Sequence, residues 1–267
     1  MPEYVEIRRE SDLINEHKKQ TFKFAVSYRN RSVPIEIPYE EFRLEAASRG
    51  KELRVTFFDT KSHKRKSYVF GMGMSGKFIS QPYEHEAPKN TRLAIIGVGG
   101  NSKTLYLTDR RNFCFWKEGS WNPKRGVDPL KDSKKWWDNL VSNLNLRIFN
   151  KPIYEVLMDQ KYCNGIGNYL RAEILGRIDI NPFQPARSYI MQAGRQLFDV
   201  TQDILASTYK YKVVQADKYN GTEPWLKYYK TGSYIDDKGG RRFWFDSKWD
   251  PNVKEMLKNQ ENVAKSK

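Results

Sequence analysis

The chain has 267 residues, enough for two modest domains with separate cores and too few for a large multidomain machine. It carries 47 Lys and Arg against 32 Asp and Glu, a formal net charge of +15 that is spread along the sequence. This charge favours a polyanionic partner such as nucleic acid, although basic proteins without such a partner have similar compositions. With two cysteines, no Cys-x-x-Cys pair and three scattered histidines, the sequence predicts no metal site and no cofactor.

Membrane and export signals are absent from the sequence pattern. No apolar run approaches the roughly 20 residues that a membrane-spanning helix needs. The first residues are charged where a signal peptide would be apolar. We therefore expect an intracellular protein without a membrane partner, in the nucleus if the source is eukaryotic and otherwise in the cytoplasm or nucleoid.

The first predicted elements are one amphipathic helix and a series of strands. The helix covers residues 3–19, where apolar side chains recur among Glu, Arg and Lys. Six strand-like runs follow, and in one of them Leu53, Val55 and Phe57 alternate with more exposed positions, the period of a half-buried strand. Such runs separated by polar turns predict an all-β sandwich or barrel-like unit. The six runs cover residues 22–28, 33–38, 52–59, 67–73, 92–98 and 103–109.

The pattern becomes helical after about Trp121. Two prolines and a glycine in 122–129 are typical of a linker. Farther on, two aromatic strand-like runs flank an acidic, glycine-rich joint and predict a β-hairpin. Helices are predicted at 131–144, 153–160, 167–178 and 189–207, and the hairpin strands at 225–235 and 241–247. The expected domains are a β-sandwich domain at 1–121, a linker at 122–128, a helical domain at 129–224, a hairpin at 225–250 and a basic tail at 251–267.

The stretch 159–175, DQKYCNGIGNYLRAEIL, is the most informative part of the sequence. Gly165 and Gly167 precede a predicted helix, so backbone N–H groups can approach a phosphate whose charge the helix N-terminus favours. Asn168 follows, where its side-chain amide can donate to the same phosphate. A helical corner packed for purely structural reasons has the same spacing, and spacing alone supports the two interpretations equally.

Five short motifs occur in one order: MPEYVE at the start, then ASRGKELRV, FGMGMSGKF, TDRRNF and NGIGNYLRAEIL. In this order they resemble the Fpg/Nei family of DNA glycosylases, whose members begin M-P-E-G-P-E and carry a helix-two-turns-helix motif. Tyr4 and Val5 depart from the Gly-Pro of that start. The resemblance spans nearly the whole chain and is strongest to the vertebrate endonuclease VIII-like branch whose zinc finger has lost its metal.

The resemblance implies a fold and a chemistry. The fold is α+β and multidomain, with an N-terminal helix plus β-sandwich domain and a C-terminal helical domain bearing the helix-two-turns-helix and a zincless β-hairpin finger. The chemistry is that of a bifunctional DNA glycosylase/AP lyase of base excision repair, acting on oxidised pyrimidines and ring-opened purines. Its nucleophile would be the secondary amine of Pro2, exposed once Met1 is removed and partly neutral near pH 7. A retained Met1 would block that amine.

Two further catalytic residues follow from the same resemblance. Glu3 would act as general acid/base on the sugar or water. Lys51 would contact a phosphate near the lesion and assist the chemistry. Without the resemblance, Pro2 and Glu3 would be an ordinary helix start and Lys51 a solvated lysine at a strand edge.

The remaining residues that the resemblance implies bind DNA. Met74, Arg111 and Phe113 would fill the gap left by a base flipped out of the duplex, although in isolation Met74 and Phe113 are more often core. Arg241 would bind phosphates beside Asn168. Because Arg242 follows directly, this assignment could shift by one residue. Recognition of the damaged base is assigned to Lys218 and Tyr219, and Glu6 would help to hold either the N-terminus or the flipped base.

The expected partner is damaged DNA, duplex or single-stranded, bound by a monomer. One alternative is a catalytically inactive nucleic-acid-binding protein with the same fold. Such a protein would keep Asn168 and Arg241 while losing Pro2 or Glu3, and this chain has all four. A second alternative, an RNA-binding protein, predicts comparable affinity for undamaged single-stranded RNA.

Overall fold

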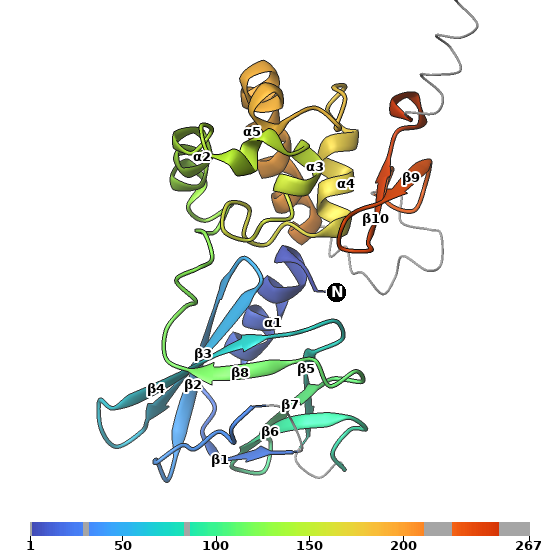
Figure 1. Cartoon of the computed structure of the whole chain (residues 1–267). Coiled ribbons are helices and arrows are strands. Elements are labelled where there is room, and N and C mark those ends of the chain that lie inside the picture. The colour runs from blue at the N-terminus through green and yellow to red at the C-terminus, as the bar shows by residue number, and fades with distance from the viewer. Residues whose placement is uncertain (1, 29–31, 83–85, 211–225, 251–267) are drawn as a thin grey trace, which may run out of the picture. The chain divides into compact units, whose positions relative to one another are not determined.

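The computed structural model describes residues 2–28, 32–82, 86–210 and 226–250 (Figure 1). The chain divides into two compact units, Met1–Arg125 and Gly126–Lys267. The division lies inside the segment 122–128 that the sequence suggests as a linker.

The described residues of the first unit form helix α1 and eight strands. The strands form one antiparallel sheet in the order β5-β7-β6-β1-β2-β3-β4-β8. Strands β1 and β2 are joined through a single residue pair, Phe22 and Phe42, so the sheet folds there into two halves that enclose a core. Helix α1 packs against β2, β3 and β5. The elements are α1 (Tyr4–Glu16), β1 (Phe22–Ser27), β2 (Phe42–Arg49), β3 (Glu52–Asp59), β4 (Arg65–Gly71), β5 (Lys77–Pro82), β6 (Thr91–Gly97), β7 (Lys103–Thr108) and β8 (Phe115–Glu118).

The predicted alternation in β3 is confirmed. Leu53, Val55 and Phe57 are fully buried, and their neighbours on the other face are partly exposed. Phe57 contacts Phe42 and Tyr68 edge to face, with ring centroids 5.3 and 5.9 Å apart. The inner side chains of β3 therefore lie at the centre of the sandwich core.

The strand predicted at 33–38 is wrong, because these residues form no ladder. Pro34 and Pro38 have no N–H to donate to a neighbouring strand. Side chains serve the intervening N–H groups instead: Ile35 donates to Ser27 Oγ at 2.9 Å, and the next residue, Glu36, donates to a tyrosine hydroxyl. The apolar character that suggested a strand comes from the burial of Ile35 in the core.

The described residues of the second unit form several helices, the longest of 25 residues, and a two-stranded hairpin. Helix α5 contains one non-helical residue, Ala193, where it kinks. The strands β9 and β10 pair antiparallel, with Arg242 opposite Asp236. The elements are α2 (Ser133–Ser142), η1 (Arg147–Asn150), α3 (Ile153–Val156), α4 (Asn168–Gly176), α5 (Ala186–Lys210), β9 (Ser233–Asp236), β10 (Arg242–Phe245) and η3 (Ser247–Trp249).

The helix predicted at 153–160 is wrong in length, because α3 ends at Val156 and the chain then turns. Gln160 explains the early end. Its amide nitrogen donates to the carbonyls of Met158 and Ile166 at 3.0 and 2.9 Å, and its amide oxygen accepts from Gly165 N at 3.0 Å. The side chain thus satisfies backbone groups of the turn that follows α3. This turn connects α3 to the start of α4.

Candidate active site and nucleic-acid interface

Pro2 and Lys51 line the same cavity of the first unit. The cavity has a volume of about 730 Å³. Its walls come from the start of the chain, the β2–β3 turn, the end of β4 and the segment 115–125. The charged side chains that line it are Lys51, Glu52, Lys117, Glu118, Lys124 and Arg125, so cations outnumber anions.

Glu3 follows Pro2 at the start of α1 but is not among the residues that line the cavity. Its side chain is 1% exposed, and the residue precedes the first helical turn in extended geometry. Glu6 caps the same end of the helix: its Oε2 accepts from the Glu3 N–H at 2.9 Å. This capping box fixes the direction in which the chain enters the helix. Pro2, one residue earlier, is half-buried and is held at the cavity by that geometry.

The turn that carries Lys51 is fixed by a buried carboxylate. Gly50 has a φ of +56°, a conformation that glycine adopts readily, and it allows the tight reversal between β2 and β3. Glu52 accepts from Arg49 Nη2 at 2.7 Å and from Asn122 N at 3.1 Å. Arg49 in turn donates to the Asn122 carbonyl at 2.7 Å. Lys51 is therefore placed by a closed set of contacts between the turn and the segment that follows β8.

The three residues assigned to the gap left by a flipped base come together on two neighbouring loops. Met74 and Phe113 are exposed by 44% and 38%, far more than core side chains of this size. Arg111 Nη1 lies 3.2 Å from the sulfur of Met74. The positions therefore favour a role at the surface over the core role that isolated apolar residues would suggest.

Asp109 holds these two loops together. Its Oδ1 accepts from Ser75 Oγ at 2.5 Å and from Arg111 N at 3.1 Å, and its Oδ2 accepts from Phe113 N and Cys114 N, both at 2.6 Å. Burial raises the pKa of Asp109, but these four hydrogen bonds outweigh it and hold the pKa below its ordinary value. The carboxylate stays ionised and fixes the backbone on which Arg111 and Phe113 stand.

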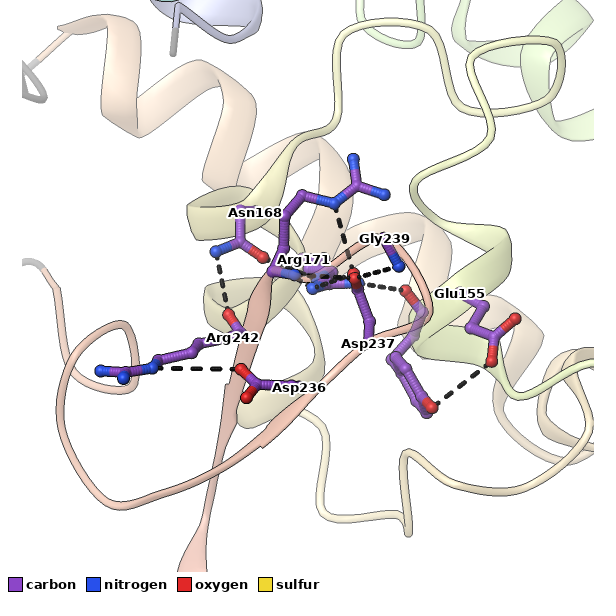
Figure 2. A network of polar contacts seen from close by, with 9 residues as sticks. Glu155, Asn168, Arg171, Asp236, Asp237, Gly239 and Arg242 are labelled. Carbon is purple, nitrogen blue, oxygen red and sulfur yellow. Dashed lines mark hydrogen bonds and ion pairs between the residues drawn. The ribbon is translucent and has the colours of Figure 1, made fainter.

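In the second unit, Asn168 belongs to a polar network that joins α4 to the hairpin (Figure 2). Asn168 Nδ2 donates to the Arg242 carbonyl at 2.9 Å, and its Oδ1 accepts from Arg171 Nη2 at 2.7 Å. Arg171 Nη2 also donates to Asp237 Oδ2 at 2.9 Å. Residues from one helix and one hairpin thus share a single set of contacts.

Arg241, the predicted phosphate ligand of the hairpin, is attached to the same network. Its backbone N donates to Asp237 Oδ1 at 3.0 Å, and its Nε lies 3.4 Å from Asp237 Oδ2. The Arg241 side chain remains 46% exposed. Arg241 directly, and Asn168 through Arg171, are therefore connected to Asp237.

Aromatic packing attaches the hairpin to the helices. Phe243 stacks on Tyr154 with ring centroids 4.7 Å apart and an interplanar angle of 7°. Phe245 contacts Phe183 edge to face at 5.0 Å. Both hairpin side chains are buried. In the described ranges no three His, Cys, Asp or Glu side chains come together in a way that could hold a metal ion.

Two predicted residues, Lys218 and Tyr219, lie outside the described residues. Among the residues that the structure describes, no helix is long and apolar enough to cross a bilayer.

Known proteins similar to this chain identify its family. No protein-family model matches the chain. Endonuclease 8-like 1 of Homo sapiens is 32% identical, across 100% of this chain and 77% of the human protein. The chain belongs to the Fpg/Nei family of DNA glycosylases. The Mus musculus endonuclease 8-like 1 is 35% identical across 81% of this chain and 58% of its own length, which agrees with the endonuclease VIII-like branch that the motifs suggested.

Solved structures agree with the Fpg/Nei fold. The Lactococcus lactis Fpg in a complex with DNA containing an oxidised pyrimidine has a TM-score of 0.70 and 18% identity, covering 92% of this chain and 98% of that one. The Thermus thermophilus Fpg has a TM-score of 0.60 and 24% identity, covering 78% and 76%. The predicted fold class is thereby confirmed. The endonuclease 8-like relatives confirm the predicted enzyme class, a DNA glycosylase with AP lyase activity that acts in base excision repair.

Sequence reasoning missed four residues of this Fpg/Nei site. Ser75, Asp109 and Arg171 stand inside the motifs that carried the resemblance, next to residues that were assigned roles. Their position in those motifs was a usable signal. Asp237 stands in the acidic, glycine-rich joint of the hairpin, where the sequence predicts only a turn. Its contact with an arginine 66 residues earlier had no sequence signal.

Proposed function

We propose that this Fpg/Nei enzyme removes oxidised pyrimidines and ring-opened purines from DNA, with the amine of Pro2 as its nucleophile once Met1 is removed. The observation that carries the proposal is that Pro2 and Lys51, 49 positions apart in sequence, line one cavity of the first unit. The cationic lining of this cavity suits a site that accepts a nucleotide with its phosphates.

The proposed reaction begins with attack of the Pro2 nitrogen on C1′ of the damaged nucleoside. The N-glycosyl bond breaks, its electron pair leaves with the base, and the base takes up a proton. Opening of the C1′–O4′ bond gives an iminium ion, and O4′ takes up a proton to replace the one that the attacking amine has lost. This ion acidifies the C2′ proton; loss of that proton breaks the C3′–O bond and releases the phosphate, and water finally hydrolyses the iminium and restores the amine.

Glu3 and Lys51 supply the proton transfers and charge that this sequence needs. Glu3 is adjacent to Pro2 and buried, and we assign it the general acid/base role, worth typically about 10² to 10⁴ in rate. Lys51 lies on the cavity wall, where an ammonium group can bind a phosphate beside the reacting sugar. Glu6, whose carboxylate caps α1, is better supported as the residue that holds the N-terminus than as a contact to the base.

Met74, Arg111 and Phe113 are proposed to fill the gap left by the flipped nucleotide. Their exposure on two loops joined by Asp109 supports this role. Flipping a base costs a few kcal/mol, and side chains that enter the vacated stack recover part of that cost. We further propose that the enzyme acts as a monomer on duplex and single-stranded DNA.

Borohydride trapping tests the nucleophile, because hydride reduces the iminium to a stable amine bond between protein and DNA. Protein with Pro2 at its terminus is expected to form a covalent adduct on DNA carrying an oxidised pyrimidine. The matched control is the same chain with Met1 retained, which is expected to bind the DNA but form no adduct. An equal yield of adduct from the two forms would show that Pro2 is not the nucleophile.

The same experiment separates the enzyme from an inactive DNA-binding protein of the same fold. That alternative predicts damage-independent binding through Asn168 and Arg241 with no adduct from either form. Excised base, measured by release from a labelled duplex, is the second readout. Tight binding to undamaged single-stranded RNA would instead favour an RNA-binding role.

A further inference from the structure

The contacts of Asp237 link both proposed phosphate-binding residues of the second unit. Asp237 Oδ1 accepts from Gly239 N at 2.9 Å and from Arg241 N at 3.0 Å, which shapes the hairpin turn that presents Arg241. Its Oδ2 faces two guanidinium groups, Arg171 at 2.9 Å and Arg241 at 3.4 Å. One carboxylate therefore organises the turn, the exposed arginine on it and the buried arginine behind it.

We propose that Asp237 is a positioning residue that sets Arg241 and Asn168 as one phosphate-binding pair, with Arg171 as the connection between them. The inference rests on the proposed function, in which those two residues bind phosphate. It adds that their geometry depends on a carboxylate that touches no DNA itself.

Arg171 transmits this effect to Asn168. Its guanidinium donates to Asn168 Oδ1 from Nη2 at 2.7 Å and from Nε at 3.1 Å, and the same Nη2 contacts Asp237. With the amide oxygen so held, Asn168 directs its two N–H donors away from Arg171, and the bond to the Arg242 carbonyl uses one of them. The bond to the Arg242 carbonyl, drawn in Figure 2, leaves the other donor for a phosphate.

Burial makes the Asp237 carboxylate hard to replace. The Arg171 side chain is 0% exposed and lies over the rings of Phe243 and Tyr154, with its guanidinium carbon 5.0 and 5.8 Å from their centroids. A guanidinium stays charged in such surroundings and needs a charged partner. Burial raises the pKa of Asp237, but hydrogen bonds from the Arg241 N–H and the Arg171 guanidinium outweigh it, so the pKa lies below its ordinary value.

Neighbouring aspartates provide a matched pair of variants. Asp237→Asn and Asp236→Asn each remove one negative charge from adjacent hairpin positions. The Asp236 side chain is 67% exposed and lies 4.0 Å from Arg242, whereas the Asp237 side chain is 4% exposed. Charge alone predicts that both variants bind DNA slightly more tightly. The positioning role predicts opposite results for the two.

The experiment measures affinity for a duplex with an abasic-site analogue over a series of salt concentrations. Asp237→Asn is expected to weaken binding by about tenfold at low salt, and to reduce the slope of log affinity against log salt by about 0.9 for each phosphate that the variant no longer neutralises. Asp236→Asn is expected to bind as tightly as the parent or slightly better, with an unchanged slope. Single-turnover cleavage at saturating protein should be the same for both, because Asp237 is assigned no part in the chemistry.

Two further variants make the result decisive. Asn168→Ala and Arg241→Ala test the proposed function: if neither weakens binding, the phosphate-binding assignment itself fails. If both weaken binding but Asp237→Asn matches Asp236→Asn in affinity and slope, the positioning role is overturned and the assignment stands. Arg171→Lys keeps the buried charge and removes the forked contact to Asn168. If circular dichroism shows that Asp237→Asn is unfolded, the Arg171→Lys variant provides the test instead. An Arg171→Lys variant with the same slope of log affinity against log salt as the parent would overturn the proposal.

Discussion

At the scale of single residues, Glu10 shows how one buried carboxyl group couples folding to pH. Glu10 stands on α1, and its Oε2 accepts from Phe78 N at 2.6 Å, which ties the helix that follows Pro2 to strand β5. Burial raises the pKa of Glu10 to about 8; the Phe78 N–H and Lys77 lower it and Glu6 raises it. At neutral pH the group is therefore mostly protonated in the folded enzyme.

The raised pKa of Glu10 predicts that the enzyme loses stability as pH rises. The unfolded chain releases this proton near pH 4.5, and the folded chain retains it until about pH 8. The stabilisation is thus complete below pH 4.5 and is lost between those two values. Glu10→Gln should flatten the pH dependence of the free energy of unfolding across that window, measured by urea denaturation. Glu45→Gln, on an exposed position of β2, is the control, and an equal flattening from it would contradict the account.

At the scale of secondary-structure elements, Met74, Arg111 and Phe113 lie together only if the two loops that carry them are in close contact. Gly73 has a φ of +57°, and a Cβ at this position would lie 2.7 Å from the Phe113 backbone carbon and Cβ. Both the backbone conformation and the contact therefore require glycine. The loop of Met74 can lie against the loop of Phe113 only because Gly73 has no side chain.

Gly73→Ala is consequently expected to separate the two loops. The cost in the free energy of unfolding should be about 1 to 3 kcal/mol, the usual range for a strained backbone or an overpacked contact. Excision from duplex DNA should fall more than excision from single strands, because only in a duplex does the flipped base leave a gap between stacked base pairs. Gly100→Ala is the control, since a Cβ there meets nothing within 4 Å. Equal losses on duplex and single-stranded substrates would rule out the gap-filling role.

Element prediction succeeded where local pattern and burial agree. The alternation in β3 and the amphipathic pattern of α1 are visible in a few residues, so both elements were predicted. Three strands were missed: β2 holds two adjacent alanines and a glutamate, β5 mixes apolar with polar residues and ends in a proline, and β8 has only four residues. These strands depend on pairing with distant strands, which a local window does not contain. The strand predicted at 33–38 is wrong for the opposite reason: the local pattern is apolar, but Ile35 is buried without the segment pairing to another strand.

At the scale of the whole molecule, sequence reasoning located the residues that motifs carry but not the contacts that position them. Pro2 and Lys51 were assigned from separate motifs, and the structure places them on one cavity. The carboxylates that support the site act across the fold instead. Asp109 binds a serine 34 residues earlier, and Asp237 binds an arginine 66 residues earlier. Such pairs are set by the topology, so a sequence without its fold gives no reason to choose these aspartates over others.

The net charge of +15 leads to a prediction about the whole enzyme on DNA. Affinity for duplex DNA should fall steeply with salt, by about 0.9 in log affinity per log unit of salt for each neutralised phosphate. Damaged and undamaged duplexes carry the same phosphates, so their slopes should be parallel. The damaged-to-undamaged affinity ratio should then stay constant as salt rises, because a flipped base is recognised by a cavity and by side chains entering the stack. Fluorescence anisotropy on matched duplexes measures both slopes. A ratio that falls towards one at high salt would mean that the lesion is recognised through additional phosphate contacts, contrary to the roles assigned to Met74 and Phe113.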